Sequence, residues 1–128
     1  MSTLRSIKYQ VINVEIPAAN AEVSTSQVNT DKNFKTVTGI QAIATDATAF
    51  NKGTFDKFLI GGQEIYPEGF DIKLISCGNE VDPNDRFDKD INEPAEGSTV
   101  NITIADGGTA TAYPYTAKVV LKLEKPIR

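Results

Sequence analysis

The stretch AYPYTAKVVLKL, residues 112–123, sets the fold class of this chain. Every second residue from Tyr113 to Leu123 is apolar, whereas Thr116, Lys118 and Lys122 occupy alternate positions. Successive side chains of a β-strand point to opposite faces, so this alternation predicts a strand with one buried and one solvated face. A strand of that kind is typical of an antiparallel sheet that covers a core on one side only.

Strand-like segments recur along the rest of the chain, with turn residues between them. Gly61-Gly62 tolerate the positive φ of a tight turn and predict a hairpin. The expected strands cover residues 6–17, 21–28, 34–45, 54–60, 63–66, 70–76, 98–105 and 112–123. About eight strands without a convincing helix predict an all-β chain, namely a single antiparallel β-sandwich domain over residues 1–128, of jelly-roll or Greek-key type.

Two of these segments carry finer predictions. In residues 6–17 the apolar set changes phase at Val11-Ile12, which predicts a β-bulge or a crossing between sheets. In residues 70–76 the alternation of Phe70, Ile72 and Leu74 predicts a strand with these three side chains on one face.

Composition agrees with sheet and excludes several classes of protein. The 128 residues include 13 Ile, 9 Val and 13 Thr against 5 Leu, and β-branched side chains favour pleated surfaces. The net charge of −4 argues against a general nucleic-acid binder. No apolar run is long enough for a membrane span. The first residues lack the apolar core of a signal peptide, and Cys77 is the only cysteine, so we expect a chain made in the cytoplasm without disulfides.

Residues 77–97 are expected to form a long acidic loop within the domain. Seven acidic residues and two basic ones give residues 80–96 a charge of −5. Counted from Asp82 as position 1, oxygen-bearing side chains match ligand positions of a twelve-residue calcium loop at Asp82, Asn84, Asp88, Asp90 and Glu93. The match fails at position 5, which is Arg86, and at position 6, where Phe87 replaces the required glycine. A solvated acidic loop is therefore the preferred interpretation, with calcium binding as the alternative.

The sequence offers no catalytic machinery and no cofactor motif. A chain without histidine excludes the Ser-His-Asp and Cys-His arrangements and the common zinc sites. The Gly-Gly pairs are interpreted as hairpin turns, not phosphate loops. Four tyrosines, Tyr9, Tyr66, Tyr113 and Tyr115, are interpreted as half-buried strand residues in preference to a ligand-stacking surface. We therefore expect a protein that is not an enzyme and holds no cofactor.

Two stretches carry a resemblance to a known class of protein. They are FLIGGQEIYPEGF at residues 58–70 and VNITIADGG at residues 100–108, followed by the alternating final strand. Over residues 35–123 the chain resembles small β-sandwich virion proteins of bacteriophages that infect Bacteroidetes, including the crAss-like group. The resemblance implies a capsid auxiliary or decoration protein, a vertex protein or a fibre anchor, located in the virion and assembled in the host cytoplasm.

The resulting hypothesis is a structural protein that assembles with itself, as trimers or pentamers, and with other virion proteins. Opposite charges would set the register between copies. The acidic candidates are Asp85, Asp88 and Asp90, and the basic ones are Arg5, Lys8, Lys118, Lys122, Lys125 and Arg128. Reversing the three acidic charges should weaken assembly. The competing hypothesis is an adhesin-like sandwich that binds carbohydrate or calcium.

Overall fold

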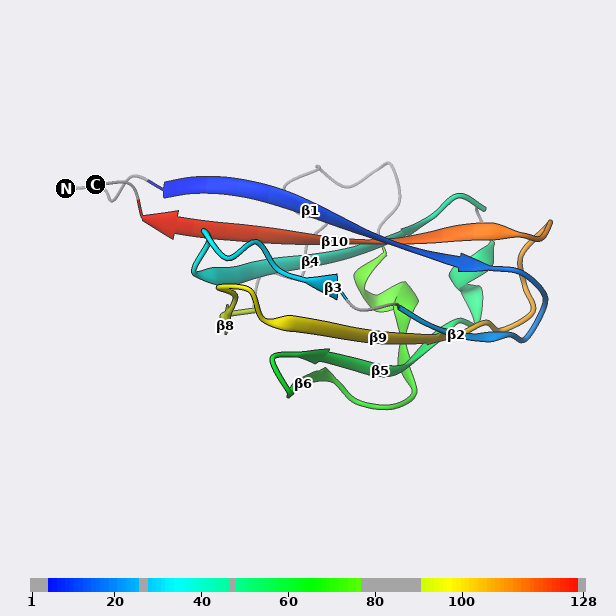
Figure 1. Cartoon of the computed structure of the whole chain (residues 1–128). Coiled ribbons are helices and arrows are strands. Elements are labelled where there is room, and N and C mark those ends of the chain that lie inside the picture. The colour runs from blue at the N-terminus through cyan, green and yellow to red at the C-terminus, as the bar shows by residue number, and fades with distance from the viewer. Residues whose placement is uncertain (1–4, 26–27, 47, 77–90, 127–128) are drawn as a thin grey trace.

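The computed structural model describes residues 5–25, 28–46, 48–76 and 91–126, and these form two antiparallel sheets packed face to face (Figure 1). Sheet A has the strand order β1 (Arg5–Ile16), β10 (Tyr115–Pro126), β4 (Thr36–Ala44), β8 (Glu93–Pro94). Sheet B has the order β2 (Glu22–Ser24), β9 (Thr99–Ala105), β5 (Thr54–Ile60), β6 (Gln63–Tyr66), with β3 (Val28–Asn29) beside β9 and β7 (Phe70–Asp71) beside β5. The all-β, two-sheet prediction is confirmed.

The core lies between the sheets and is built from the alternating residues of each strand. In β10 the inward set is buried, as the alternation predicts, and consists of Tyr115, Ala117, Val119, Leu121 and Leu123. Sheet B contributes an aromatic cluster in which the ring centroids of Tyr66 and Phe70 lie 4.3 Å apart and those of Phe55 and Phe58 lie 5.0 Å apart. Each fully buried side chain of this size stabilises the fold by about 1.5–3 kcal/mol.

The bulge predicted at Val11-Ile12 is wrong. Strand β1 pairs with β10 from Arg5 to Ile16 without a register shift. Ile12 is buried, whereas Val11 is 50% exposed. The phase of the apolar pattern changes because β1 carries apolar side chains on both faces, and only one face meets the core. The irregularity in sheet A lies instead in β4, where Thr38 is the extra residue between Val37 and Gly39.

The strand predicted at residues 70–76 is also wrong beyond its first two residues. After β7 the chain turns into a 3-10 helix, η2 (Ile72–Ile75). Ile72 and Ile75 are buried, while Leu74 is 68% exposed. A 3-10 helix has three residues per turn, so side chains three positions apart share a face. The relevant spacing is therefore three, and the alternation of Phe70, Ile72 and Leu74 is a coincidence.

The turns differ from the predictions in part. The Gly61-Gly62 hairpin is confirmed, because Ile60 pairs with Gln63 and both glycines have positive φ, at 59° and 83°. A second 3-10 turn, η1 (Ala49–Asn51), follows Thr48.

Part of the expected acidic loop is a strand, β8, which pairs with β4. The described residues hold ten strands against about eight predicted, and the two additional strands, β3 and β8, have two residues each. In the described part of the chain, no helix is long and apolar enough to cross a membrane.

A buried carboxylate, Asp106, joins the end of β9 to the loop that precedes β10. It is 6% exposed. Its oxygens accept hydrogen bonds from the Tyr113 hydroxyl at 2.6 Å and the Tyr115 hydroxyl at 2.9 Å. They also accept from the backbone amides of Asn20 at 2.9 Å and Gly108 at 3.0 Å. Burial raises the pKa of Asp106, but these four hydrogen bonds outweigh burial and hold its pKa below the ordinary value of 3.8.

We expect the stability of the protein to fall at both ends of the pH range. The folded pKa of Asp106 is lowered, so its contribution is complete above about pH 4 and is lost as the pH falls through the folded pKa. Burial and the bond to Asp106 raise the pKa of Tyr115, so the unfolded chain loses that proton first and stability falls above about pH 10. Urea unfolding from pH 2 to 11 measures both limbs, and Asp106→Asn should flatten the acid limb. An acid limb equally steep in that variant would contradict the assignment.

Candidate functional site

The outward side of sheet A, called here the outer face, exposes large apolar side chains between lysines. Strand β1 exposes Ile7 by 44%, Tyr9 by 51% and Val11 by 50%, and Ile43 of β4 is 40% exposed. Residues opposite each other in antiparallel strands share a face. Tyr9 pairs with Lys122, and Lys118 lies between Asn13 and Ile43, so both lysines belong to this face.

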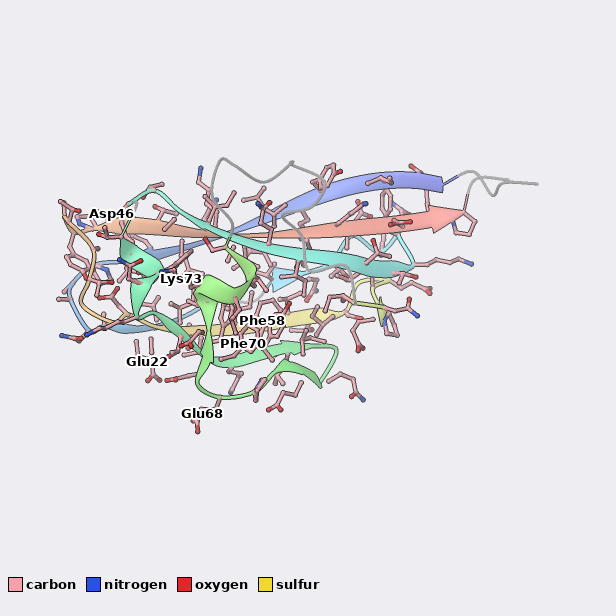
Figure 2. The ribbon with its side chains drawn as sticks, turned by 180° about the vertical axis from the view of Figure 1, so that it is seen from behind. Glu22, Asp46, Phe58, Glu68, Phe70 and Lys73 are labelled. Carbon is pink, nitrogen blue, oxygen red and sulfur yellow. The ribbon has the colours of Figure 1, made fainter. Side chains whose placement is uncertain are left out.

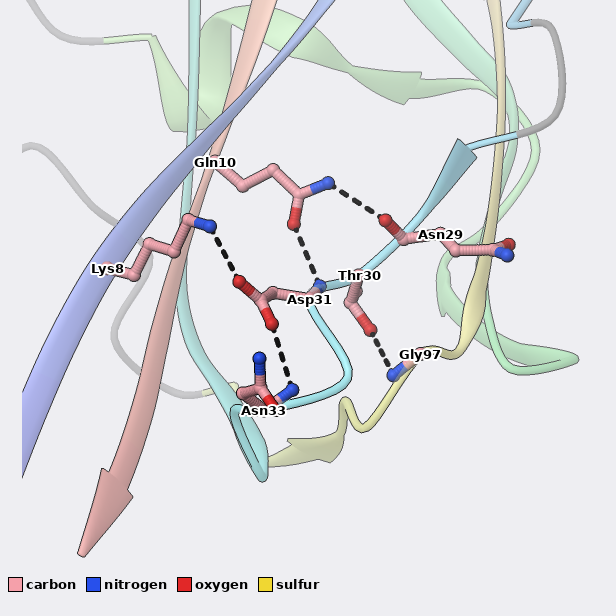
Figure 3. Close-up of polar contacts among 7 residues, drawn as sticks. All are labelled: Lys8, Gln10, Asn29, Thr30, Asp31, Asn33 and Gly97. Carbon is pink, nitrogen blue, oxygen red and sulfur yellow. Dashed lines mark hydrogen bonds and ion pairs between the residues drawn. The ribbon is translucent and has the colours of Figure 1, made fainter. Parts of the chain in front are cut away.

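The opposite side of β1 changes character along the strand, because its core-facing set is apolar only from Ile12 onward. Before that point Lys8 and Gln10 contact the end of β3 and the residues that follow it (Figure 3). Lys8 Nζ donates to Asp31 Oδ2 at 2.6 Å, Gln10 Nε2 donates to the Asn29 carbonyl at 2.9 Å, and the Asp31 amide donates to Gln10 Oε1 at 3.3 Å. The bond from Lys8 is the main reason that the pKa of Asp31 is lowered. These polar contacts connect the first half of β1 to sheet B. Because exposed ion pairs and hydrogen bonds stabilise a fold only weakly, they add little to the free energy of unfolding.

The edge of β1 that lies away from β10 is the second feature of this region. Among the described residues β1 pairs with β10 alone, so it is the edge strand of sheet A. The carbonyls of Thr116 and Glu124 accept from the amides of Thr45 and Lys35, so even-numbered residues of β10 face β4. Odd-numbered residues of β10 therefore face β1, where the register places even-numbered partners opposite them. It follows that the amides and carbonyls of Ile7, Tyr9, Val11, Asn13 and Glu15 point away from the sheet.

The predicted basic interface residues do not form one group. Lys118 and Lys122 lie on the outer face, but Lys125 sits over the Phe34 ring, 5.0 Å from its centroid. Lys8 is paired with Asp31 in its own chain. The side chain of Arg5 and residue Arg128 lie outside the described residues, as do the acidic candidates Asp85, Asp88 and Asp90.

The calcium hypothesis falls largely on residues that the structure does not describe. Asp82, Asn84, Asp88 and Asp90 are outside the described residues, and so is Cys77. Glu93 is described, and it lies in β8, half-buried beside Val37 of β4. Within residues 5–25, 28–46, 48–76 and 91–126, no group of three or more acidic or sulfur side chains is placed to hold a metal ion.

The four tyrosines do not share a surface. Tyr66 and Tyr115 are buried in the core, Tyr113 is half-buried beside Tyr115, and Tyr9 lies on the outer face. The four do not form one ligand-stacking platform, because they lie on different elements of both sheets. The prediction of half-buried strand residues is wrong for Tyr66 and Tyr115, which are buried, and for Tyr113, which precedes β10.

Sheet B brings together acidic side chains that are far apart in the sequence. Glu22 of β2 lies close to Asp56 of β5. Glu68 follows β6, and Figure 2 shows it on the same side of the molecule as Glu22. The hydrogen bond to Asp56 and then the charge of Asp56 raise the pKa of Glu22 above its ordinary value of 4.5. Sequence analysis missed this group because the pairing of β9 with both β2 and β5 creates it.

The apolar members of the outer face were also missed as a site. Their signal is present in the sequence, since β1 has apolar residues at both odd and even positions. A strand of a sandwich needs only one apolar face, so a second apolar set is a candidate for contacts outside the core. Comparison with known proteins adds no candidate, because no family model, curated protein or solved structure matches this chain.

Proposed function

We propose that the protein is a non-enzymatic structural component of a phage virion, which acts by associating with copies of itself and with other virion proteins. The observation that carries the proposal is the outer face of sheet A. It sets exposed Ile7, Tyr9, Val11 and Ile43 beside Lys118 and Lys122. Apolar side chains ringed by charge are typical of protein–protein contact surfaces.

The resemblance of residues 35–123 to phage β-sandwich proteins supports the virion as the setting. A capsid auxiliary, vertex or fibre-anchoring protein acts by contact alone, so a sandwich with an apolar outer face suits that role. The partners are other virion proteins and further copies of this chain. The order of symmetry, proposed from the sequence as three or five, depends on which surfaces pair.

Reversing the charge of the outer face should weaken self-association. The double variant Lys118→Glu/Lys122→Glu places two acidic groups among the exposed apolar side chains, and we expect its dissociation constant to rise on the order of tenfold at low salt. Light scattering over a range of concentrations gives the mass. Lys57→Glu is the matched control, because Lys57 is exposed but lies on β5 of sheet B.

The same measurement separates assembly from the competing adhesin-like module. A mass above that of one chain, indifferent to calcium and to chelator, supports a building block. A monomer whose melting temperature rises with calcium contradicts the proposal and favours a calcium-binding module.

A further inference from the structure

We propose that the outer face of sheet A packs against the outer face of a second copy, about a two-fold axis that runs along the strands between β1 and β10. The inference rests on the proposed function, because it assumes that copies associate, and it names the surface through which they do so. The observation behind it is the division of side chains on this face. Strand β1 carries exposed apolar residues and an acid, whereas β10 carries the lysines.

The half of the outer face formed by β1 and β10 is more exposed than the half formed by β4. Val11 of β1 is 50% exposed, and Lys118 of β10 is exposed. Gln41 of β4 lies on the same face, because it pairs with Val120, which in turn pairs with Val11. It is nevertheless only 6% exposed. A contact driven by burial of exposed apolar surface therefore centres on β1 and β10.

Charge on this half of the face is divided between the two strands. Among the described side chains of β1, Glu15 is the charged group that points outward, and it is exposed. Strand β10 presents Lys118 and Lys122. Within the described part of the chain, these three groups make no ion pair, and the pair of Lys8 with Asp31 lies on the other side of β1. The face therefore offers both signs of charge to a partner.

The division of charge selects the direction of the axis. A two-fold axis across the strands puts β10 over β10 and brings the lysines of the two copies together. An axis along the strands, between β1 and β10, puts β1 of each copy over β10 of the other. The lysines then meet a strand that has no lysine on this face. Opposed like charges weaken an interface, so the axis along the strands is the favoured one.

The same axis fixes which residues meet. A two-fold axis allows no shift along its own direction, so each residue of β1 faces, in the second copy, the residue of β10 with which it pairs in its own copy. Val11 therefore lies over Val120 of the second copy. Glu15 lies over Thr116 and two positions along the strand from Lys118. The contact has an apolar centre with opposite charges around it, which is the usual anatomy of a protein interface.

A second copy is the occupant because one face supplies both halves of the match. An isologous interface needs a self-complementary surface, and here the acid and the lysines lie on two strands that exchange places about the axis. Packed sheets cross at about 30°, so the fit is closest near Val11, and flexible lysine side chains accommodate the offset toward the ends. A two-fold contact closes with two copies, so light scattering should give the mass of two chains.

Exchange of charge between the strands tests the contact. Glu15→Lys places a cation beside Lys118 of the second copy, and its dissociation constant should rise by about tenfold. The double variant Glu15→Lys/Lys118→Glu restores opposite charges across the axis and should return the dissociation constant to within about threefold of the wild-type value. Glu64→Lys is the matched control, because it makes the same change of charge at an exposed position of β6 in sheet B.

The apolar centre has a test of its own. Val11→Lys places a charge over Val120 of the second copy, where association would bury it, and the dissociation constant should rise by about a hundredfold or more. Val11 is half exposed in the single copy, so the variant should keep the far-UV circular dichroism of the wild type.

The outcomes separate this contact from the proposed function. An oligomer that is indifferent to both Val11→Lys and Glu15→Lys overturns the face-to-face contact but leaves the assembly function standing. Weakening by Glu15→Lys without recovery in the double variant overturns the proposed axis. A wild type that stays a monomer overturns the contact and the assembly function together.

Discussion

Replacing Asp106 by alanine is expected to lower the free energy of unfolding by about 3–4 kcal/mol. The carboxylate is almost fully buried and accepts four hydrogen bonds, two from tyrosine hydroxyls and two from backbone amides. Removing it leaves the buried Tyr115 hydroxyl without an acceptor, at a cost of about 1–3 kcal/mol, and also removes three part-buried hydrogen bonds, each worth about 0.5–1.5 kcal/mol net. The Ala21 carbonyl also accepts from the Asp106 amide at 2.9 Å, which alanine preserves. The loss therefore reports on the side chain alone.

Urea unfolding measures this loss, and two variants calibrate it. Tyr113→Phe removes one of the four donors and should cost about 1 kcal/mol. Asp106→Asn keeps one carbonyl acceptor and should fall between the two. A cost for Asp106→Ala no larger than that of Tyr113→Phe would show that the four bonds do not act together.

Gly107→Ala, at the neighbouring position, is expected to cost about 2–3 kcal/mol. A Cβ added at Gly107 would overlap both the carbonyl oxygen and the Cβ of Lys52. The obstacle is main chain, so the loop before β5 and the loop after β9 have to separate to admit a methyl group. Because Asp106 anchors the second loop from the adjacent position, that separation also strains its hydrogen bonds.

Gly53→Ala is the matched control for Gly107→Ala. A Cβ at Gly53 would meet its nearest neighbour, Cδ1 of Ile72, at 3.5 Å, which is ordinary van der Waals contact. We expect it to change stability by less than about 1 kcal/mol. Thermal unfolding of the two variants compares them, and equal shifts in melting temperature would contradict the steric explanation.

Local pattern was enough to predict the parts of the fold that a single strand determines. The alternation in residues 112–123 gave the buried set of β10, and Gly61-Gly62 gave the hairpin between β5 and β6. The prediction failed where the structure of a segment depends on the elements that pack against it. Residues 72–75 alternate like a strand but form η2, because the neighbouring elements bury Ile72 and Ile75 rather than Leu74.

The candidate interface was predictable only in part for the same reason. Lys118 and Lys122 were identified from charge. Which side chains lie beside them on the outer face depends on the order of the strands in sheet A. That order results from pairing β1 with β10, and no local signal in residues 6–17 specifies a partner about a hundred residues later. Likewise, Glu22 and Asp56 become neighbours only when β9 lies between their strands.

The pairing of the first strand with the last also sets the order of events as the chain is made. Ile16 pairs with Tyr115, and Arg5 pairs with Pro126. Strand β1 therefore cannot pair with β10 while the ribosome is still synthesising the strands between them. The hairpin of β5 and β6 can form earlier, because a two-residue turn joins its strands, whereas β2 and β5 are linked only through β9. Contacts between distant residues slow folding and leave strand edges open in the meantime. Sheet A can therefore close only after β10 has left the ribosome, and until then β1 is open to strands of other nascent chains as well as to its own.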